Sequence, residues 1–286
     1  MKVLVTGANG QLGQEVVKLL QKNNIQCLPC SKEDMDITSK QSVQDKVITF
    51  QPNVIIHTAA YTHVDLAETN KDKAFSVNGL GTRNVAEVAE EIGAVVCYIS
   101  TDYVFDGQSR VPYSEDSQPN PMTIYGKAKY EGEQYVRSIC SHYFILRTSW
   151  VFGSNGQNFV KTILKLSKEK SSIQVVSDQF GSPTYTVDLA AFIYNLIQTN
   201  LYGVYHVTNS GDCSWYDFAK SIVRISGRDV TIEPVDTQSF PRPAPRPKYS
   251  VLKHANIQAN NLPDLQHWQE ALHAFLNEMG EVSNGE

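Results

Sequence analysis

The first half of the chain alternates short apolar runs with longer segments in which apolar residues recur at helical spacing. The apolar runs predict β-strands at residues 2–6, 25–30, 54–58, 95–100 and 144–148. The intervening segments predict helices that begin near Leu12, Ser42, Gly81 and Tyr125. Because the strands are short and apolar and alternate with helices, we expect an α/β fold, a Rossmann-type doubly wound parallel sheet with helices on both faces. Such a sheet has a ligand crevice at the carboxyl ends of its strands.

The alternation loosens after about residue 150. We predict helices at residues 158–168, 188–198, 215–226 and 267–279 and a further strand at residues 203–208. A loop rich in Pro and Arg fills residues 240–247, and residues 280–286 are expected to fray. We therefore expect a core at residues 1–150 and, at residues 151–286, mainly a smaller lobe that is interleaved with the core and closes over the crevice.

Composition excludes several classes of protein. A net charge of −5 argues against the basic face of a nucleic-acid-binding protein. The apolar runs are much shorter than the roughly 18 residues that cross a bilayer, and the amino terminus lacks the pattern of a signal peptide. We predict a cytoplasmic protein that binds neither nucleic acid nor membrane. Cys27 and Cys30 have the spacing of a redox motif but lie in a predicted strand, where we expect two buried thiols.

Three glycines follow the first strand and open the first helix. Gly7, Gly10 and Gly13 stand at positions i, i+3 and i+6 of this turn. Early glycines let backbone N–H groups approach a pyrophosphate, and the last lets the helix pack close to the strand. In this strand–turn–helix context the spacing predicts a dinucleotide-binding turn, which makes residues 1–150 an NAD(P)-binding core.

The end of the second strand usually distinguishes NAD from NADP. Ser31 and Lys32 stand where an acidic residue would bind the adenosine 2′-hydroxyl of NAD. A hydroxyl and a cation suit a 2′-phosphate, so NADP(H) is favoured as the cofactor. Glu33 keeps NAD(H) as an alternative.

Tyr125 and Lys129 lie four residues apart at the start of a predicted helix, so they share one face of it. Carbonyl reduction needs a proton donor, and a free phenol has a pKa near 10. We expect the Lys129 ammonium and an oxidised nicotinamide to lower the pKa of Tyr125. A third polar group is expected at the end of the fourth strand, where either Ser100 or Thr101 could face the crevice.

With these features in place, the sequence resembles the extended short-chain dehydrogenases and, within them, the dTDP-4-dehydrorhamnose reductases. The resemblance covers nearly the whole chain. It is carried by residues 5–13 (VTGANGQLG), 59–68 (AAYTHVDLAE), 100–107 (STDYVFDG), 125–129 (YGKAK), 147–152 (RTSWVF), 178–184 (DQFGSPT) and 246–252 (RPKYSVL).

The resemblance implies that NADPH or NADH reduces the C4 keto group of a dTDP-linked sugar to give dTDP-L-rhamnose. It implies that Thr101, Tyr125 and Lys129 are catalytic. The cofactor ligands that it implies are Gly7, Gly10, Gln11, Leu12, Asp36, Ile37, Ala59, Ala60, Tyr61 and Lys129. The residues that it places in the sugar site, beside Thr101 and Tyr125, are Thr62, Val64, Asp102, Tyr103 and Trp150.

Some residues have more than one interpretation. Without the resemblance, Trp150 would be assigned to the core, and Arg242 and Arg246 are either solvated charges or ligands of the substrate diphosphate. Some members of the resembled family are metal-bridged dimers. Glu15 and Asp188 are acids that such a bridge could use, and a Mg²⁺ site and a homodimer both stay undecided.

Two alternative functions follow from the same sequence pattern. One is a nucleotide-sugar epimerase, which would consume no reductant. The other is a non-catalytic NADP-binding regulatory subunit, against which the complete set of Thr101, Tyr125 and Lys129 argues.

Overall fold

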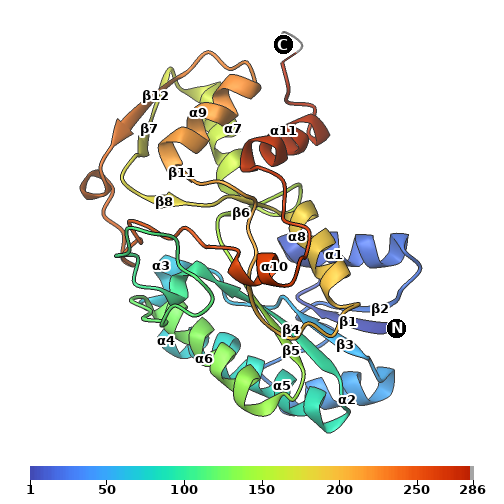
Figure 1. The fold of residues 1–286 in the computed structure, drawn as a ribbon. Coiled ribbons are helices and arrows are strands. Elements are labelled where there is room, and N and C mark those ends of the chain that lie inside the picture. Colours follow the sequence, from blue (N-terminus) through green and yellow to red (C-terminus); the bar gives the residue numbers. More distant parts are fainter. Residues whose placement is uncertain (284–286) are drawn as a thin grey trace.

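Six parallel strands form the central sheet of the computed structural model, which describes residues 1–283 (Figure 1). The strands are β1 (Lys2–Thr6), β2 (Gln26–Cys30), β3 (Val54–His57), β4 (Val95–Thr101), β5 (Tyr143–Thr148) and β10 (Gly203–His206). Their order is β10-β5-β4-β3-β1-β2, and every neighbouring pair is parallel. The chain reverses direction across the sheet between β1 and β3, which places a crevice at their carboxyl ends.

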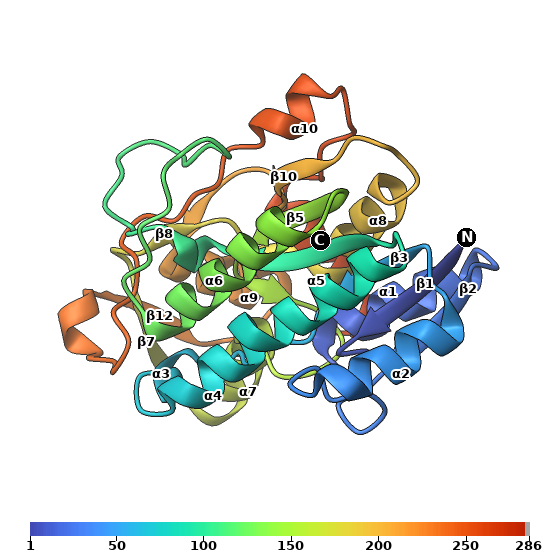
Figure 2. The same cartoon turned by 90° about the horizontal axis from the view of Figure 1, so that it is seen from below.

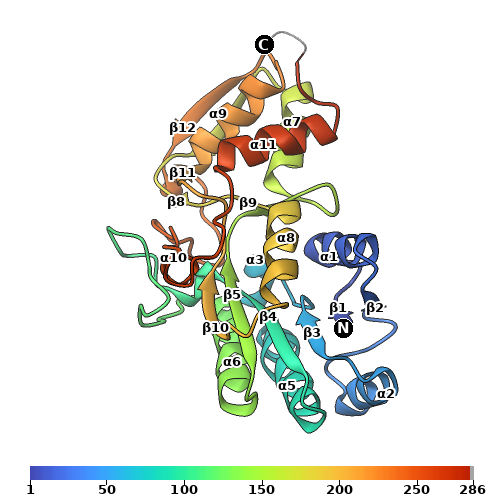
Figure 3. The same ribbon diagram turned by 45° about the vertical axis from the view of Figure 1, so that its right-hand side comes forward.

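Helices cover both faces of this sheet (Figures 2 and 3). One face carries α1 (Gln11–Lys22) and α8 (Thr186–Leu196), and the other carries α2 (Lys40–Phe50), α5 (Thr82–Glu91) and α6 (Ile124–Ile139). Side chains alternate along each strand, so Val3 and Val5 pack toward α1 and α8 while Leu4 packs toward α2 and α5. The predicted Rossmann-type doubly wound sheet is confirmed.

The segment between β3 and α5 is more broken than the sequence predicted. It contains α3 (Val64–Ala67), α4 (Lys71–Phe75) and a π-helical turn (Ser76–Gly81). A 3-10 turn (Asp102–Val104) likewise follows β4. Elements of three to six residues are too short to show an apolar period, which is why sequence reasoning missed them.

A smaller lobe lies above the carboxyl edge of the sheet (Figure 1). Its helices α7 (Phe159–Glu169), α9 (Trp215–Ile225) and α11 (Trp268–Glu278) share an apolar core with the parallel strand pair β7 (Ser172–Val176) and β12 (Thr231–Val235). Two further pairs are β6 (Val151–Phe152) with β9 (Thr184–Tyr185), and β8 (Phe180–Gly181) with β11 (Cys213–Ser214). A 3-10 turn (Thr237–Ser239) completes it. The short helix α10 (Ala255–Ala259) packs instead against β10 of the central sheet, where Asn256 donates to the Val204 carbonyl at 2.8 Å. Although α8 and β10 follow residue 150, both belong to the central sheet layer.

The carboxyl terminus corrects one prediction. Residues 280–283 do not fray, because the Ser283 N–H donates to the Ile225 carbonyl at 3.1 Å and Glu281 forms an ion pair with Lys168 at 3.2 Å. The rest of the segment predicted to fray, residues 284–286, lies outside the described residues. Among residues 1–283, helices long and apolar enough to cross a membrane are absent.

The two thiols of the Cys27–Cys30 segment lie on β2. Cys30 is buried, as predicted, whereas Cys27 is only half-buried. Burial raises the pKa of both thiols to about 11. Neither thiol is therefore activated for redox chemistry.

Candidate active site

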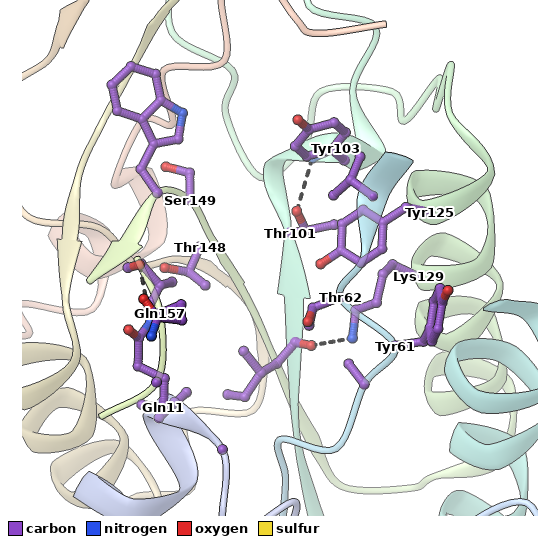
Figure 4. A pocket seen from close by; sticks show the side chains of 18 of the residues that line it. Gln11, Tyr61, Thr62, Thr101, Tyr103, Tyr125, Lys129, Thr148, Ser149 and Gln157 are labelled. Atoms are coloured by element: carbon purple, nitrogen blue, oxygen red, sulfur yellow. Dashed lines mark hydrogen bonds between the residues drawn. The ribbon is translucent and has the colours of Figure 1, made fainter. Parts of the chain in front are cut away.

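A cleft of about 1610 Å³ opens between the carboxyl edge of the sheet and the lobe (Figure 4). Every residue that the sequence singled out for the site lines it. These residues are Gly7, Gly10, Gln11, Leu12, Ser31, Lys32, Asp36, Ile37, Ala59, Ala60, Tyr61, Thr62, Val64, Thr101, Asp102, Tyr103, Tyr125, Lys129 and Trp150. Segments far apart in the chain thus meet at one surface.

The glycine turn leaves the amino end of α1 open toward this cleft. Gly10 is the N-cap of α1 and offers no side-chain cap, whereas Ser39, Thr123 and Asn158 cap α2, α6 and α7 with their side chains. Gly7 has a φ of +63°, and a Cβ there would lie 2.7 Å from the backbone of Ala59. The uncapped N–H groups and the side-chain-free cradle fit a pyrophosphate.

The side chain of Gln11 joins the two parts of the molecule. Its amide nitrogen donates to the Val151 carbonyl at 3.1 Å, and its amide oxygen accepts from Asn158 at 2.9 Å. The amide group is thereby engaged with the lobe. Gln11 therefore contributes its backbone, and not its side-chain amide, to the uncapped amino end of α1.

At the end of β2 the structure separates the two residues that favoured NADP(H). The Ser31 hydroxyl donates to the Asp34 carboxylate at 2.7 Å and closes a local turn. Lys32 is exposed on the cleft wall. The cation is therefore better placed than the hydroxyl to meet a 2′-phosphate.

Asn78, which the sequence did not single out, holds the segment after β3. Its side-chain oxygen accepts the Tyr61 N–H at 2.7 Å and its side-chain nitrogen donates to the Tyr61 carbonyl at 3.0 Å. Asn78 is fully buried in the π-helical turn. These two hydrogen bonds hold the backbone of the segment that carries Ala59, Ala60 and Tyr61. No local sequence pattern indicates this role of Asn78.

Ser100 and Thr101 both line the cleft, but their hydroxyl groups have different partners. The Ser100 hydroxyl donates to Glu133 at 2.6 Å, and Glu133 is itself paired with Arg147 at 2.7 Å. The Thr101 hydroxyl instead lies beside Tyr125 at the cleft and accepts the Tyr103 N–H at 3.2 Å (Figure 4). It also donates to Asp102 at 3.0 Å. Thr101 is therefore the hydroxyl at the end of β4 that is placed to reach a ligand.

Tyr125 sits in the first turn of α6, which Thr123 caps by accepting the Gly126 N–H at 3.0 Å. Its ring meets Tyr103 edge-on, with centroids 5.6 Å apart. Burial raises the pKa of Tyr125 to about 12, although the Thr101 hydroxyl opposes this shift. The sequence predicted a pKa lowered by the Lys129 ammonium and an oxidised nicotinamide, whereas in this structure desolvation of the phenol raises it.

Lys129 lies one turn further along the same face and is 2% exposed. Its ammonium donates to the Ile99 carbonyl at 2.6 Å (Figure 4). Burial lowers the pKa of Lys129 to about 7, and the charge of Glu133 partly offsets this. The protonation state of Lys129 therefore changes with pH around neutrality.

Asp102 is a buried carboxyl group that lines the cleft next to Thr101. Its Oδ2 atom forms no hydrogen bond of good geometry with the described residues, and burial raises the pKa of Asp102 to about 6 although the Ser250 and Thr101 hydroxyls oppose this shift. An unpaired acceptor that lines a cleft is suited to a ligand hydroxyl group.

Trp150 and Arg246 are both more constrained than the sequence suggested. Trp150 lines the cleft, but one face of its ring is stacked on Trp215. The Arg246 guanidinium donates to Asp65 on α3 at 2.8 Å, while Arg242 also lines the cleft. The Pro- and Arg-rich loop is thereby attached to α3 at the edge of the cleft.

The two acids considered for a metal bridge have protein partners. Glu15 accepts from Asn155 at 3.0 Å, and Asp188 accepts from Asn209 at 2.7 Å and from Gln266 at 2.9 Å. Within residues 1–283, His, Cys, Asp and Glu side chains form no group of three or more with metal-binding geometry. Both carboxylates are thereby engaged by side-chain amide groups.

Comparison with known proteins gives one consistent result. The family described as RmlD substrate binding domain matches residues 1–281. The spore coat polysaccharide biosynthesis protein SpsK of Bacillus subtilis is 45% identical, with 97% of each chain covered. A dTDP-4-dehydrorhamnose reductase of Aggregatibacter actinomycetemcomitans is 39% identical, over 95% of this chain and 97% of that one.

A solved structure agrees with these sequence matches. The crystal structure of a dTDP-4-dehydrorhamnose reductase of Bacillus anthracis in complex with NADP is 46% identical and superposes with a TM-score of 0.95. The match covers 97% of this chain and 100% of that one.

Proposed function

We propose, because this chain belongs to the RmlD substrate binding domain family, that it reduces the C4 keto group of dTDP-4-dehydro-L-rhamnose to give dTDP-L-rhamnose, with NADPH as the favoured reductant. Family membership confirms the resemblance expected from the sequence. The observation that carries the proposal is the line of Thr101, Tyr125 and Lys129 along one wall of a cleft that begins at an uncapped helix end.

The cofactor would lie across the carboxyl edge of the sheet. The glycine turn and the first N–H groups of α1 would hold its pyrophosphate, and Lys32 would meet a 2′-phosphate. Residues 59–61 and Lys129 would flank its nicotinamide end. Bound there, NADPH supplies the hydride that the C4 carbon accepts.

Tyr125 is the proposed proton donor. Its raised pKa keeps the phenol protonated at neutral pH, which is the state that an acid needs in the direction of reduction. Thr101 would hydrogen-bond the same carbonyl oxygen. A protonated Lys129 would stabilise the phenolate that forms when Tyr125 gives up its proton.

The sugar would lie between the sheet and the lobe. We place Thr62, Val64, Asp102, Tyr103 and Trp150 around it, with the Asp102 Oδ2 acceptor toward a sugar hydroxyl group. In this arrangement residues 1–150 mainly bind the cofactor, and residues 151–286 mainly bind the substrate.

A single assay tests the activity and separates the alternatives. Purified protein is mixed with NADPH and dTDP-4-dehydro-L-rhamnose, the loss of NADPH absorbance is followed, and the product is identified by NMR. We expect one NADPH to be consumed per sugar reduced. An epimerase would change the sugar without net NADPH loss, and a regulatory subunit would bind NADP but oxidise no NADPH; either outcome overturns the proposal.

We also propose a cytoplasmic location and a homodimer as the working state. Sedimentation velocity with added Mg²⁺ and with a chelator measures the oligomeric state and its metal dependence together. A monomer under both conditions would refute the dimer without affecting the proposed reaction.

A further inference from the structure

The ammonium group of Lys129 lies over the ring of Tyr98. Its Nζ atom is 4.1 Å from the ring centroid, well within cation–π distance. Tyr98 is fully buried on β4, in the core beneath α5 and α6. It does not line the cleft, and Lys129 is a cleft residue that it contacts directly.

A second contact couples the same two residues. The Tyr98 hydroxyl donates to the Lys129 backbone carbonyl at 3.1 Å, while Nζ of Lys129 donates to the carbonyl of Ile99, the next residue of β4. The strand therefore contacts Lys129 at its backbone carbonyl and at the end of its side chain. The ring occupies the space between these two hydrogen bonds.

We propose that Tyr98 is a positioning residue of this active site, whose ring holds the Lys129 ammonium against β4 and keeps it protonated. The inference rests on the proposed function, in which Lys129 must be a cation beside Tyr125. It assigns to a core residue a part in the reaction that the cleft alone does not reveal.

The other charged and titratable groups around Lys129 do not replace the ring. Glu133 on α6 favours the ammonium, but its carboxylate is shared with the Arg147 guanidinium on β5. His57 on β3 is neutral, because burial and the Lys129 charge lower its pKa to about 3. Tyr125 on α6 keeps its proton, since burial raises its pKa to about 12.

The sign of the expected effect follows from these surroundings. Lys129 loses its proton as the pH rises through a pKa of about 7, far below that of Tyr125. The alkaline limb of the activity profile therefore reports on Lys129. A ring that stabilises the ammonium moves this limb to higher pH, and its removal moves the limb to lower pH.

The test compares Tyr98→Leu with Tyr98→Phe. Phe keeps the ring and loses only the hydroxyl, whereas Leu loses the π face. We expect Tyr98→Leu to shift the alkaline limb of kcat/KM for the sugar down by about one pH unit, from the usual size of a desolvated cation–π contact. We expect Tyr98→Phe to stay close to the wild-type profile. Equal shifts in both variants, or no shift in a folded Tyr98→Leu protein, would overturn the proposal.

A direct titration makes the result independent of activity. In protein with ¹³C-labelled lysine, the ε-CH₂ signal that disappears in Lys129→Met follows the protonation of Lys129 itself. A lowered titration midpoint in Tyr98→Leu supports the inference even if the substrate assignment is wrong. A wild-type midpoint in that variant refutes it even if the reductase assay succeeds.

Should Tyr98→Leu fail to fold, ring electronics can be changed without changing shape. Trifluorophenylalanine at position 98, compared with Tyr98→Phe, weakens the π face while nearly preserving ring size. We expect the Lys129 midpoint to fall in the fluorinated protein. An unchanged midpoint would show that the ring only fills space.

Discussion

The indole rings of Trp150 and Trp215 lie stacked, with centroids 3.5 Å apart and planes inclined by 11°. Trp150 has a φ of +48°, a backbone conformation that costs free energy in a residue with a Cβ. Gly181 leaves room for the Trp150 ring, because a Cβ at residue 181 would lie 2.7 Å from that ring. The lobe thus fixes the ring of Trp150 at the edge of the cleft.

Removing this support should weaken substrate binding. We expect Trp215→Leu to raise the KM for the sugar nucleotide about fivefold, because an aromatic pair contributes about 1 kcal/mol beyond its buried area. Affinity for NADPH should stay unchanged. Trp215→Phe, which keeps an aromatic partner, serves as the matched control. An unchanged KM in Trp215→Leu would show that Trp150 needs no support from Trp215.

Tyr125→Phe tests the proposed acid. General acid catalysis is worth about 10²- to 10⁴-fold, so we expect kcat to fall by that order while the Kd for NADPH changes less than about twofold. Tyr130→Phe on the same helix is the control, because Tyr130 packs against a separate apolar cluster and does not line the cleft. Turnover near the wild-type rate in Tyr125→Phe would mean that another group supplies the proton.

The sequence was sufficient where a function is contained in one continuous segment. The Gly7–Gly13 turn lies within one strand–turn–helix segment, and Tyr125 and Lys129 lie one helical turn apart on α6. Sequence spacing alone therefore predicts how the residues of each feature lie relative to one another. The strand pattern similarly predicted the parallel sheet, because each buried strand is apolar in its own right.

Features that depend on distant parts of the chain could not be predicted this way. The Ser100 hydroxyl is engaged by Glu133, which is paired with Arg147, and these two residues lie on two other elements. The direction of the Tyr125 pKa shift depends on how deeply the folded chain buries the phenol, which no local pattern records. The resemblance to a family supplied Thr101 and the sugar-side residues, and the residues taken alone left them open.

Lys32→Ala should reduce the preference for NADPH. Lys32 is exposed, so we expect its contact with a 2′-phosphate to be worth about 1 kcal/mol and its loss to raise the KM for NADPH about fivefold. The KM for NADH should change little, and the NADPH effect should shrink at high salt. Lys18→Ala, which removes an equally charged side chain from the exposed side of α1, is the control. Equal effects on both cofactors would place the 2′-phosphate elsewhere.

Gly7 and Gly93 offer a matched pair that separates backbone strain from contact with the cofactor. Their φ angles are +63° and +69°, so an Ala at either position costs about 1 kcal/mol in the left-handed region. A Cβ on Gly93 would meet open space, whereas a Cβ on Gly7 would lie 2.7 Å from the Ala59 backbone nitrogen, in the cradle where we place the pyrophosphate.

We therefore expect Gly93→Ala to lose about 1 kcal/mol of unfolding free energy in urea denaturation and to bind NADPH normally in calorimetry. Gly7→Ala should lose more stability and at least about tenfold in NADPH affinity, because the backbone around residue 59 must move away from its cofactor-binding position. Normal NADPH affinity in a folded Gly7→Ala protein would show that the pyrophosphate binds away from this turn. Because the nicotinamide belongs to the same cofactor, the hydride donor would then also lie away from Tyr125.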